Sequence, residues 1–187
     1  MTDDALFRRA GLPDALRFLA EAYPRDSWEA HANFDDLTRF WLERHAMFRD
    51  VLGRLQAESR AFLDHNADPG LFGHRTARFT QFFLDQLHGH HTIEDQHYFP
   101  LLSSHDPQLP SGFALLERDH QALDVHIHDL ASGTNTMLRA LNDGRGRDEA
   151  GRVLDLLGVF ETFLDRHLTD EEELVVPVIL QYGSPDM

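Results

Sequence analysis

Two motifs of the same form stand out among the thirteen histidines of this 187-residue chain. His90 and His167 are each followed four residues later by a glutamate, Glu94 and Glu171 respectively. A spacing of four places both side chains of a motif on one face of a helix, about one turn apart. Imidazole and carboxylate can then reach the same metal ion, so each motif predicts part of a metal site.

A single histidine precedes each motif at a similar distance. His45 lies 45 residues before His90, and His120 lies 47 residues before His167. Counted from the expected turns at ~1.5 Å per residue, all these side chains fall within one helical turn of a common level. The chain therefore resembles two helical hairpins that contribute to one layer. The predicted metal ligands are His45, His90, Glu94, His120, His167 and Glu171.

The ligand types indicate which metal fits. Imidazoles with carboxylates that can bridge, and no thiolate, favour a pair of iron ions, with manganese or zinc as alternatives. The chain has no cysteine, which excludes disulfides, thiolate catalysis and cysteine-based zinc or iron–sulfur sites. A structural zinc site is closed by four ligands, whereas six ligands over two ions leave positions open for water, dioxygen or another small molecule.

Four long helices are expected to position these residues. Proline and glycine cluster at a few breaks, and the segments of roughly thirty to forty residues between them show apolar residues at mixed spacings of three and four. The first helix is expected to begin near Asp26, where Glu29 completes a capping box. The second is expected to begin at Asp68, the third after Ser111, and the fourth to stop at Gly183.

Short connections between long amphipathic helices favour antiparallel neighbours. We therefore predict an all-α protein with an up-down-up-down antiparallel four-helix bundle over residues 26–183. A short N-terminal helical appendage is expected over residues 1–25. No segment shows the strict alternation of a strand.

The composition of the chain limits the kinds of partner that the protein is expected to bind. The formal net charge of −15 argues against nucleic acid, because neutralising phosphates requires a basic face. The acidic N-terminus does not resemble a secretory signal, and no apolar stretch is long enough to span a membrane. We expect a cytoplasmic protein, and the sequence is compatible with a homodimer.

Taken together, these motifs resemble the hemerythrin-like (HHE cation-binding) domain family, whose pattern is H…HxxxE…H…HxxxE on four antiparallel helices. The matching segments, over about residues 27–182, are HAMFRD, HHTIEDQHYFP, LERDHQAL and HLTDEEELVVP. A proline follows each motif glutamate by six residues. The resemblance implies a non-haem di-iron centre bridged by Glu94, Glu171 and an exogenous oxo or hydroxo group, with the histidines as terminal ligands.

One departure from the family concerns the third helix. Oxygen-carrying hemerythrins have two histidines four residues apart there, whereas Asp124 and Leu116 flank His120 at that spacing. We expect oxygen from Asp124 or Glu117, or water, to complete the shell of that iron. Because such ligands favour the ferric state, the reduced protein is expected to autoxidise rather than bind oxygen reversibly.

Nine further histidines and several acids beside the motifs are expected mainly at the solvated surface, with a few orienting the ligands. These histidines are His31, His65, His74, His88, His91, His97, His105, His126 and His128. The acids are Asp95, Asp170 and Glu172.

The expected function is binding or sensing of a small molecule such as dioxygen, nitric oxide or peroxide, or iron handling. No nucleophile or general base is legible, so no reaction is assigned, although peroxide-degrading or oxidase side activity fits such a centre. One alternative is a ferritin-like di-iron carboxylate oxidase, because Glu94-x-x-His97 and Glu117-x-x-His120 are present. Another is a non-metal helical interaction protein whose histidines sense pH.

Overall fold

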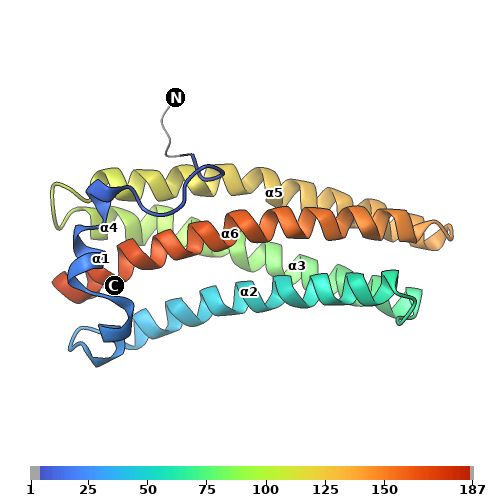
Figure 1. Cartoon of the computed structure of the whole chain (residues 1–187), viewed down its shortest axis with the longest axis horizontal. Helices are drawn as coiled ribbons and strands as arrows, with labels where there is room; N and C mark the ends of the chain where they lie inside the picture. Colours follow the sequence, from blue (N-terminus) through green and yellow to red (C-terminus); the bar gives the residue numbers. More distant parts are fainter. Residues whose placement is uncertain (1–4, 186–187) are drawn as a thin grey trace. The chain divides into compact units, whose positions relative to one another are not determined.

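The computed structural model describes residues 5–185, and all regular secondary structure within that range is helical (Figure 1). The long helices are α2 (Asp36–Leu63), α3 (Pro69–Ile93), α5 (Pro110–Asn142) and α6 (Gly146–Tyr182). The short elements are η1 (Asp14–Leu16), α1 (Phe18–Ala22), η2 (Arg25–Ala30), η3 (Glu94–Tyr98) and α4 (Phe99–Ser103). The predicted all-α helical bundle is confirmed. The first four residues of the appendage predicted over residues 1–25 lie outside the described residues.

Side-chain caps determine where two of the long helices begin. The Asp68 carboxylate accepts a hydrogen bond from the Leu71 N–H at 2.9 Å, so α3 begins where the sequence predicts. The expected start of the first long helix near Asp26 is wrong, because α2 begins ten residues later. Asp35 accepts the Thr38 N–H at 2.9 Å and so caps α2, while Asp26 lies in the short 3-10 helix η2.

The second long helix does not continue unchanged past Glu94. Residues Glu94–Tyr98 form a π-helical turn, and the chain returns to α-helical geometry in α4. Pro100 occupies the second position of α4, where its missing N–H costs little. Such single π turns are frequent at functional sites, and this one begins at a predicted ligand.

The described chain forms two compact units. The first unit comprises the residues up to 46, then 90–122 and the residues from 163 onward, and the second comprises 47–89 and 123–162. The first unit contains the beginnings of α2 and α5 and the ends of α3 and α6, which is the alternation that an up-down-up-down bundle requires. All six predicted ligands belong to this first unit.

The core of the first unit includes part of the N-terminal segment. Leu12, Leu16 and Leu19 belong to the same buried cluster as Phe99 and Leu116. The second unit has an aromatic core of its own, in which the Phe83 ring contacts those of Phe48 and Phe160 at centroid distances of 6.1 and 5.3 Å.

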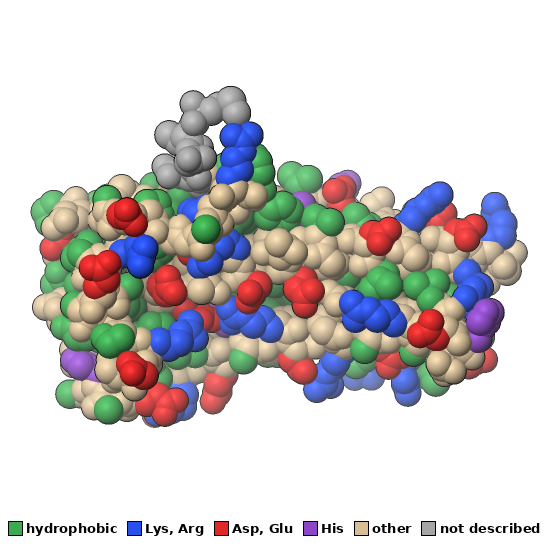
Figure 2. Space-filling view, viewed as in Figure 1, with side chains coloured by type: hydrophobic (Ala, Val, Ile, Leu, Met, Phe, Trp, Pro, Cys, Tyr) green, Lys and Arg blue, Asp and Glu red, His purple; other side chains and the backbone are tan. Residues whose placement is uncertain are grey.

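The drawn face in Figure 2 carries acidic and basic side chains interspersed, rather than gathered by sign. A nucleic-acid surface would require a basic stripe or patch. In the described part of the chain, no helix is both long and apolar enough to cross a membrane.

Candidate metal centre

Seven side chains of the first unit converge in two groups. Within each group the donor atoms all lie within 4.8 Å of one another. The three-histidine group consists of His91, His120 and His167, and the mixed group consists of His45, His90, Glu94 and Glu171. The structure thus brings together all six side chains predicted from the sequence, and adds His91.

The mixed group is closely packed and held by an indole. The Nε2 atoms of His45 and His90 are 3.0 Å apart. The Nε2 of His45 lies 3.4 Å from Glu171 Oε1, and that of His90 lies 3.0 Å from Glu94 Oε1. Trp41 donates its Nε1–H to Glu94 Oε1 at 2.6 Å, which fixes this carboxylate.

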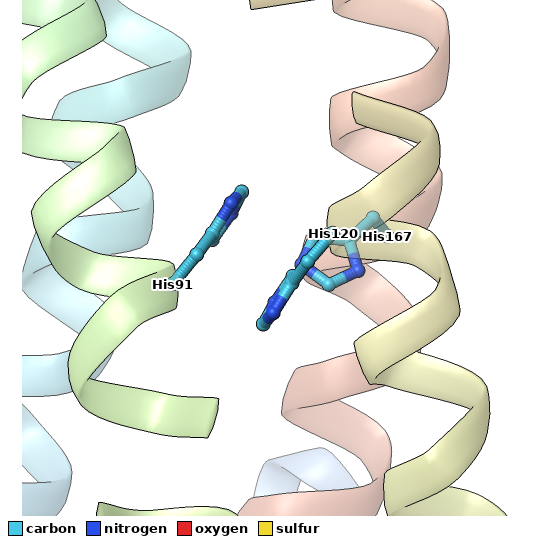
Figure 3. A group of neighbouring side chains, drawn as sticks. All are labelled: His91, His120 and His167. Carbon is cyan, nitrogen blue, oxygen red and sulfur yellow. The ribbon is translucent and has the colours of Figure 1, made fainter. Parts of the chain in front are cut away.

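Three different helices supply the three-histidine group, as Figure 3 shows. The rings of His91 and His120 stack with centroids 4.0 Å apart, and the His167 ring meets His120 edge-on at 4.8 Å. Glu94 Oε2 lies 3.7 Å from His120 Nε2, and Glu171 Oε2 lies 3.2 Å from His167 Nε2. Each carboxylate of the mixed group therefore also faces the three-histidine group.

Several donor atoms in the two groups are buried without any hydrogen bond within the described residues. They are the Nε2 atoms of His91, His120 and His167, Oε2 of Glu94 and both carboxylate oxygens of Glu171. Buried polar atoms in proteins are nearly always hydrogen-bonded. Six nitrogen and oxygen donors that face one another without a hydrogen bond in the described chain form the kind of set that binds a cation, so these residues fit a metal centre.

The carboxyl groups of Glu94 and Glu171 differ in pKa. Burial, reinforced by the charge of Glu171, raises the pKa of Glu94 well above its usual value. Burial also acts to raise the pKa of Glu171, but the neighbouring His45 and His167 outweigh it and hold that pKa well below its usual value. Two adjacent buried carboxyl groups thus share the site as one neutral and one ionised group.

The histidines differ in the same way. Burial lowers the pKa of His90 to about 3, and burial with neighbouring histidines lowers that of His91 well below its usual value. Burial acts against protonation of His167 too, but Asp119 and Glu171 outweigh it and raise this pKa to about 9. His90 and His91 are therefore ready to ligate, whereas a cation has to displace a proton from His167.

Carboxylates behind the histidines orient the rings. His45 Nδ1 lies 3.0 Å from Glu172 Oε1, and His120 Nδ1 lies 2.8 Å from Asp95 Oδ1. Because an ionised carboxylate only accepts hydrogen bonds, these Nδ1 atoms carry the protons. The Nε2 atoms then face the two groups, which is the arrangement usual for metal-binding histidines.

Arg9, from the N-terminal segment, holds a further pair of acids behind the three-histidine group. Its guanidinium donates to both oxygens of Asp119, and its Nε donates to Asp170 at 2.7 Å. Asp119 Oδ2 lies 3.6 Å from His167 Nδ1, within ion-pair range but too long for a hydrogen bond. The expected exposure of Asp170 and Glu172 is wrong, because both are buried, while the side chain of Asp95 is 37% exposed.

The surface position expected for His91 is also wrong, since this residue is only 5% exposed. It lies four residues after the buried Leu87 and three before Glu94, so it shares their helix face. His91 lies beside His120 in the three-histidine group, where the sequence predicts oxygen from Asp124 or Glu117, or water. Asp124 is exposed, Glu117 is half-buried, and neither belongs to a donor group.

The other surplus histidines lie mostly where expected. The exposed ones are His65, His74, His88, His97, His105 and His128, while His31 and His126 are half-buried. Exposure of His97 removes one of the two Glu-x-x-His motifs on which the ferritin-like alternative depends.

Comparison with known families agrees with this geometry. The sequence profile of the family described as hemerythrin HHE cation binding domain matches residues 36–179. The chain belongs to the hemerythrin family. The match begins with the first residue of α2, so the N-terminal segment lies outside it. Comparisons with curated proteins and with solved structures give no match.

Proposed function

We propose that this hemerythrin-domain protein holds two iron ions, one at each donor group, and uses them to bind or sense a small molecule or to handle iron. The proposed small molecules are dioxygen, nitric oxide and peroxide. The observation that carries the proposal is the set of six buried donor atoms that accept or donate no hydrogen bond among the described residues and lie in two adjoining groups. When bound, such an iron pair supplies redox chemistry and open coordination positions for a small ligand.

The two glutamates have the central role in this proposal. Glu94 and Glu171 each direct one oxygen toward each group, which suits carboxylates that bridge two ions. Five imidazoles and two carboxylates are too few donors to fill two octahedral ions. Positions therefore stay available for a small molecule, and imidazole with carboxylate favours iron over magnesium or calcium.

Apolar side chains limit the access of water to these residues. The Phe99 ring stacks on His120 with centroids 5.6 Å apart, and Phe99 is 1% exposed. Trp41 lies against His45 and His90 at centroid distances of 6.0 and 6.5 Å. Such a dry lining strengthens electrostatic interactions with bound ions and excludes larger substrates.

The presence of His91 changes the expectation for dioxygen. The sequence predicts autoxidation because it places oxygen from an acid or water in the position of a fifth imidazole. With His91 buried in the three-histidine group, that reason is lost, and reversible oxygen binding stands beside sensing and peroxide or nitric oxide handling.

The test is metal analysis with an optical spectrum of protein purified in air. We expect two iron atoms per chain and charge-transfer absorption that changes on adding azide or peroxide. His91→Ala should lower the iron content, whereas His74→Ala, an exposed histidine on the same helix, should not. Protein that takes up no iron, manganese or zinc would contradict the proposal. Metal uptake that is unaffected by substitutions at Glu94 or Glu171 would show that the metal site lies elsewhere.

A further inference from the structure

The N-terminal segment, residues 5–35, precedes the part of the chain that matches the hemerythrin family. It nevertheless reaches the surroundings of the metal centre twice, through the arginines Arg9 and Arg25. The segment is tied to α6, because Arg166 donates to the backbone carbonyl of Ala10 at 2.9 Å. Each arginine meets a carboxylate that stands directly behind a histidine of the centre.

Arg25 acts behind the mixed group. Its guanidinium donates to Glu172 Oε2, while the other oxygen of Glu172 lies 3.0 Å from His45 Nδ1. The Glu172 side chain is 3% exposed and that of Arg25 is 58% exposed, so the arginine seals a buried acid from the solvent side. Arg25 also lies over the Trp28 ring at 4.7 Å, and Trp28 packs on Val176 of α6.

Arg9 acts behind the three-histidine group. Its side chain is 3% exposed and engages Asp119 and Asp170 together, through different nitrogens. Asp119 is the acid nearest to Nδ1 of His167, and Asp170 is also bound by Arg166. One arginine thus holds two buried acids in fixed positions beside a metal-facing histidine.

The function of such outer carboxylates is to orient a metal-binding imidazole, and removing a partner of this kind typically costs 10–100-fold in metal affinity. A buried carboxylate keeps its orientation only when a counter-charge or hydrogen-bond donor holds it. In this chain an arginine from outside the family match supplies such a donor for each group, Arg25 to Glu172 and Arg9 to Asp119.

We propose that the N-terminal segment is a positioning element of the metal centre. Arg25 acts through Glu172 on His45 of the mixed group, and Arg9 acts through Asp119 on His167 of the three-histidine group. Both arginines are positioning residues, and each governs the retention of a different ion. This inference rests on the proposed function, because it requires one ion at each group.

The test follows metal release from the full chain loaded with two zinc ions, a redox-silent probe, into excess chromophoric chelator. Arg25→Gln should release one ion at least tenfold faster and the other at the wild-type rate. Arg9→Gln should likewise accelerate one ion, and the double variant should accelerate both. Arg17→Gln is the matched control, since Arg17 lies in the same segment and pairs only with the exposed Asp14 among the described residues.

Conservative replacements separate positioning from general stability. Arg25→Lys should restore slow release, because one ammonium group can reach the single oxygen that Arg25 binds. Arg9→Lys should not restore slow release, because one ammonium group cannot replace a guanidinium that binds the carboxylates of both Asp119 and Asp170. If Arg9→Gln does not fold, Arg9→Lys is measured in its place, and release of both ions at the wild-type rate from that variant would overturn the role of Arg9.

Release at the wild-type rate from Arg25→Gln would overturn the inference. Equal acceleration of both ions by that single variant would also overturn it, because it would indicate general loosening. A wild-type protein that binds fewer than two zinc ions would instead count against the proposed function.

Discussion

Alkaline pH should destabilise the metal-free protein because of the proton on His167. This histidine has a pKa raised to about 9 in the folded chain, against 6.5 when unfolded. A group whose pKa is raised on folding contributes stability that is fully present below the unfolded pKa and is lost as pH rises through the folded value. The contribution of His167 is therefore complete below pH 6.5 and disappears by about pH 9.

The size of the effect follows from that shift. A rise of the His167 pKa from 6.5 to about 9 on folding corresponds to about 3 kcal/mol of folding stability, at about 1.36 kcal/mol for each pKa unit. His45 contributes with the same sign, because burial acts to lower its pKa but Glu171 and Glu172 outweigh it and raise that pKa above its usual value. The pKa of Glu94 is also raised on folding, so ionisation of this carboxyl group lowers the free energy of unfolding as pH increases.

The assay is urea unfolding of metal-free protein at several pH values between 6.5 and 9. We expect the free energy of unfolding to fall by about 3 kcal/mol across this range. Asp119→Asn should flatten the dependence, because Asp119 holds the His167 proton in place, while the exposed His74→Gln should leave it unchanged. Stability that stays constant or rises with pH would refute the assignment of a proton to His167. Metal-loaded protein should lack this fall, since a cation replaces that proton.

Four further predictions concern individual side chains and the bound metal. Replacing Glu94 or Glu171 by Ala should empty or halve the metal content, measured by metal analysis, whereas Glu173→Ala, half-buried on α6, should leave it at the wild-type level. Trp41→Phe removes the donor to Glu94 and should weaken metal retention against a chelator by about tenfold; unchanged retention would show that the indole only fills space. His91→Ala should speed oxidation of the ferrous protein by air, followed by stopped-flow absorbance, and a slower oxidation would contradict the role of the fifth imidazole. Chelation should lower the melting temperature, because ligands that bind only the folded state add RT ln(1 + [L]/Kd) to its stability, about 3 kcal/mol at 100 Kd.

Helical periodicity was sufficient to predict the residues that face the centre along a single helix. The spacing of four between His90 and Glu94 and the common level of His45 and His120 depend only on helix geometry. His91 was also within reach of this reasoning, since Leu87 and Glu94 bracket it on the same face, but its neighbour His90 already filled the motif.

Burial of Glu172 and Asp170 could not be read from periodicity. Their partners Arg25 and Arg9 lie 147 and 161 residues away along the chain. A run of acids at the end of α6 looks solvated until a distant segment brings the guanidinium groups that neutralise it. The start of α2 at Asp36 was missed for a local reason, because Asp35 and the pair at Asp26 and Glu29 are competing caps of similar strength.

The spread of the site along the chain has a consequence for biosynthesis. The donor groups and their arginine supports run from Arg9 to Glu172, so the centre can be complete only after Glu172 has left the ribosome. A nascent chain that ends before His167 offers two histidines of one group and no Glu171 for the other. On the proposed assignment, the two groups can hold a pair of ions only once synthesis has passed Glu172, and a chain stalled before His167 is not expected to accumulate a paired metal centre.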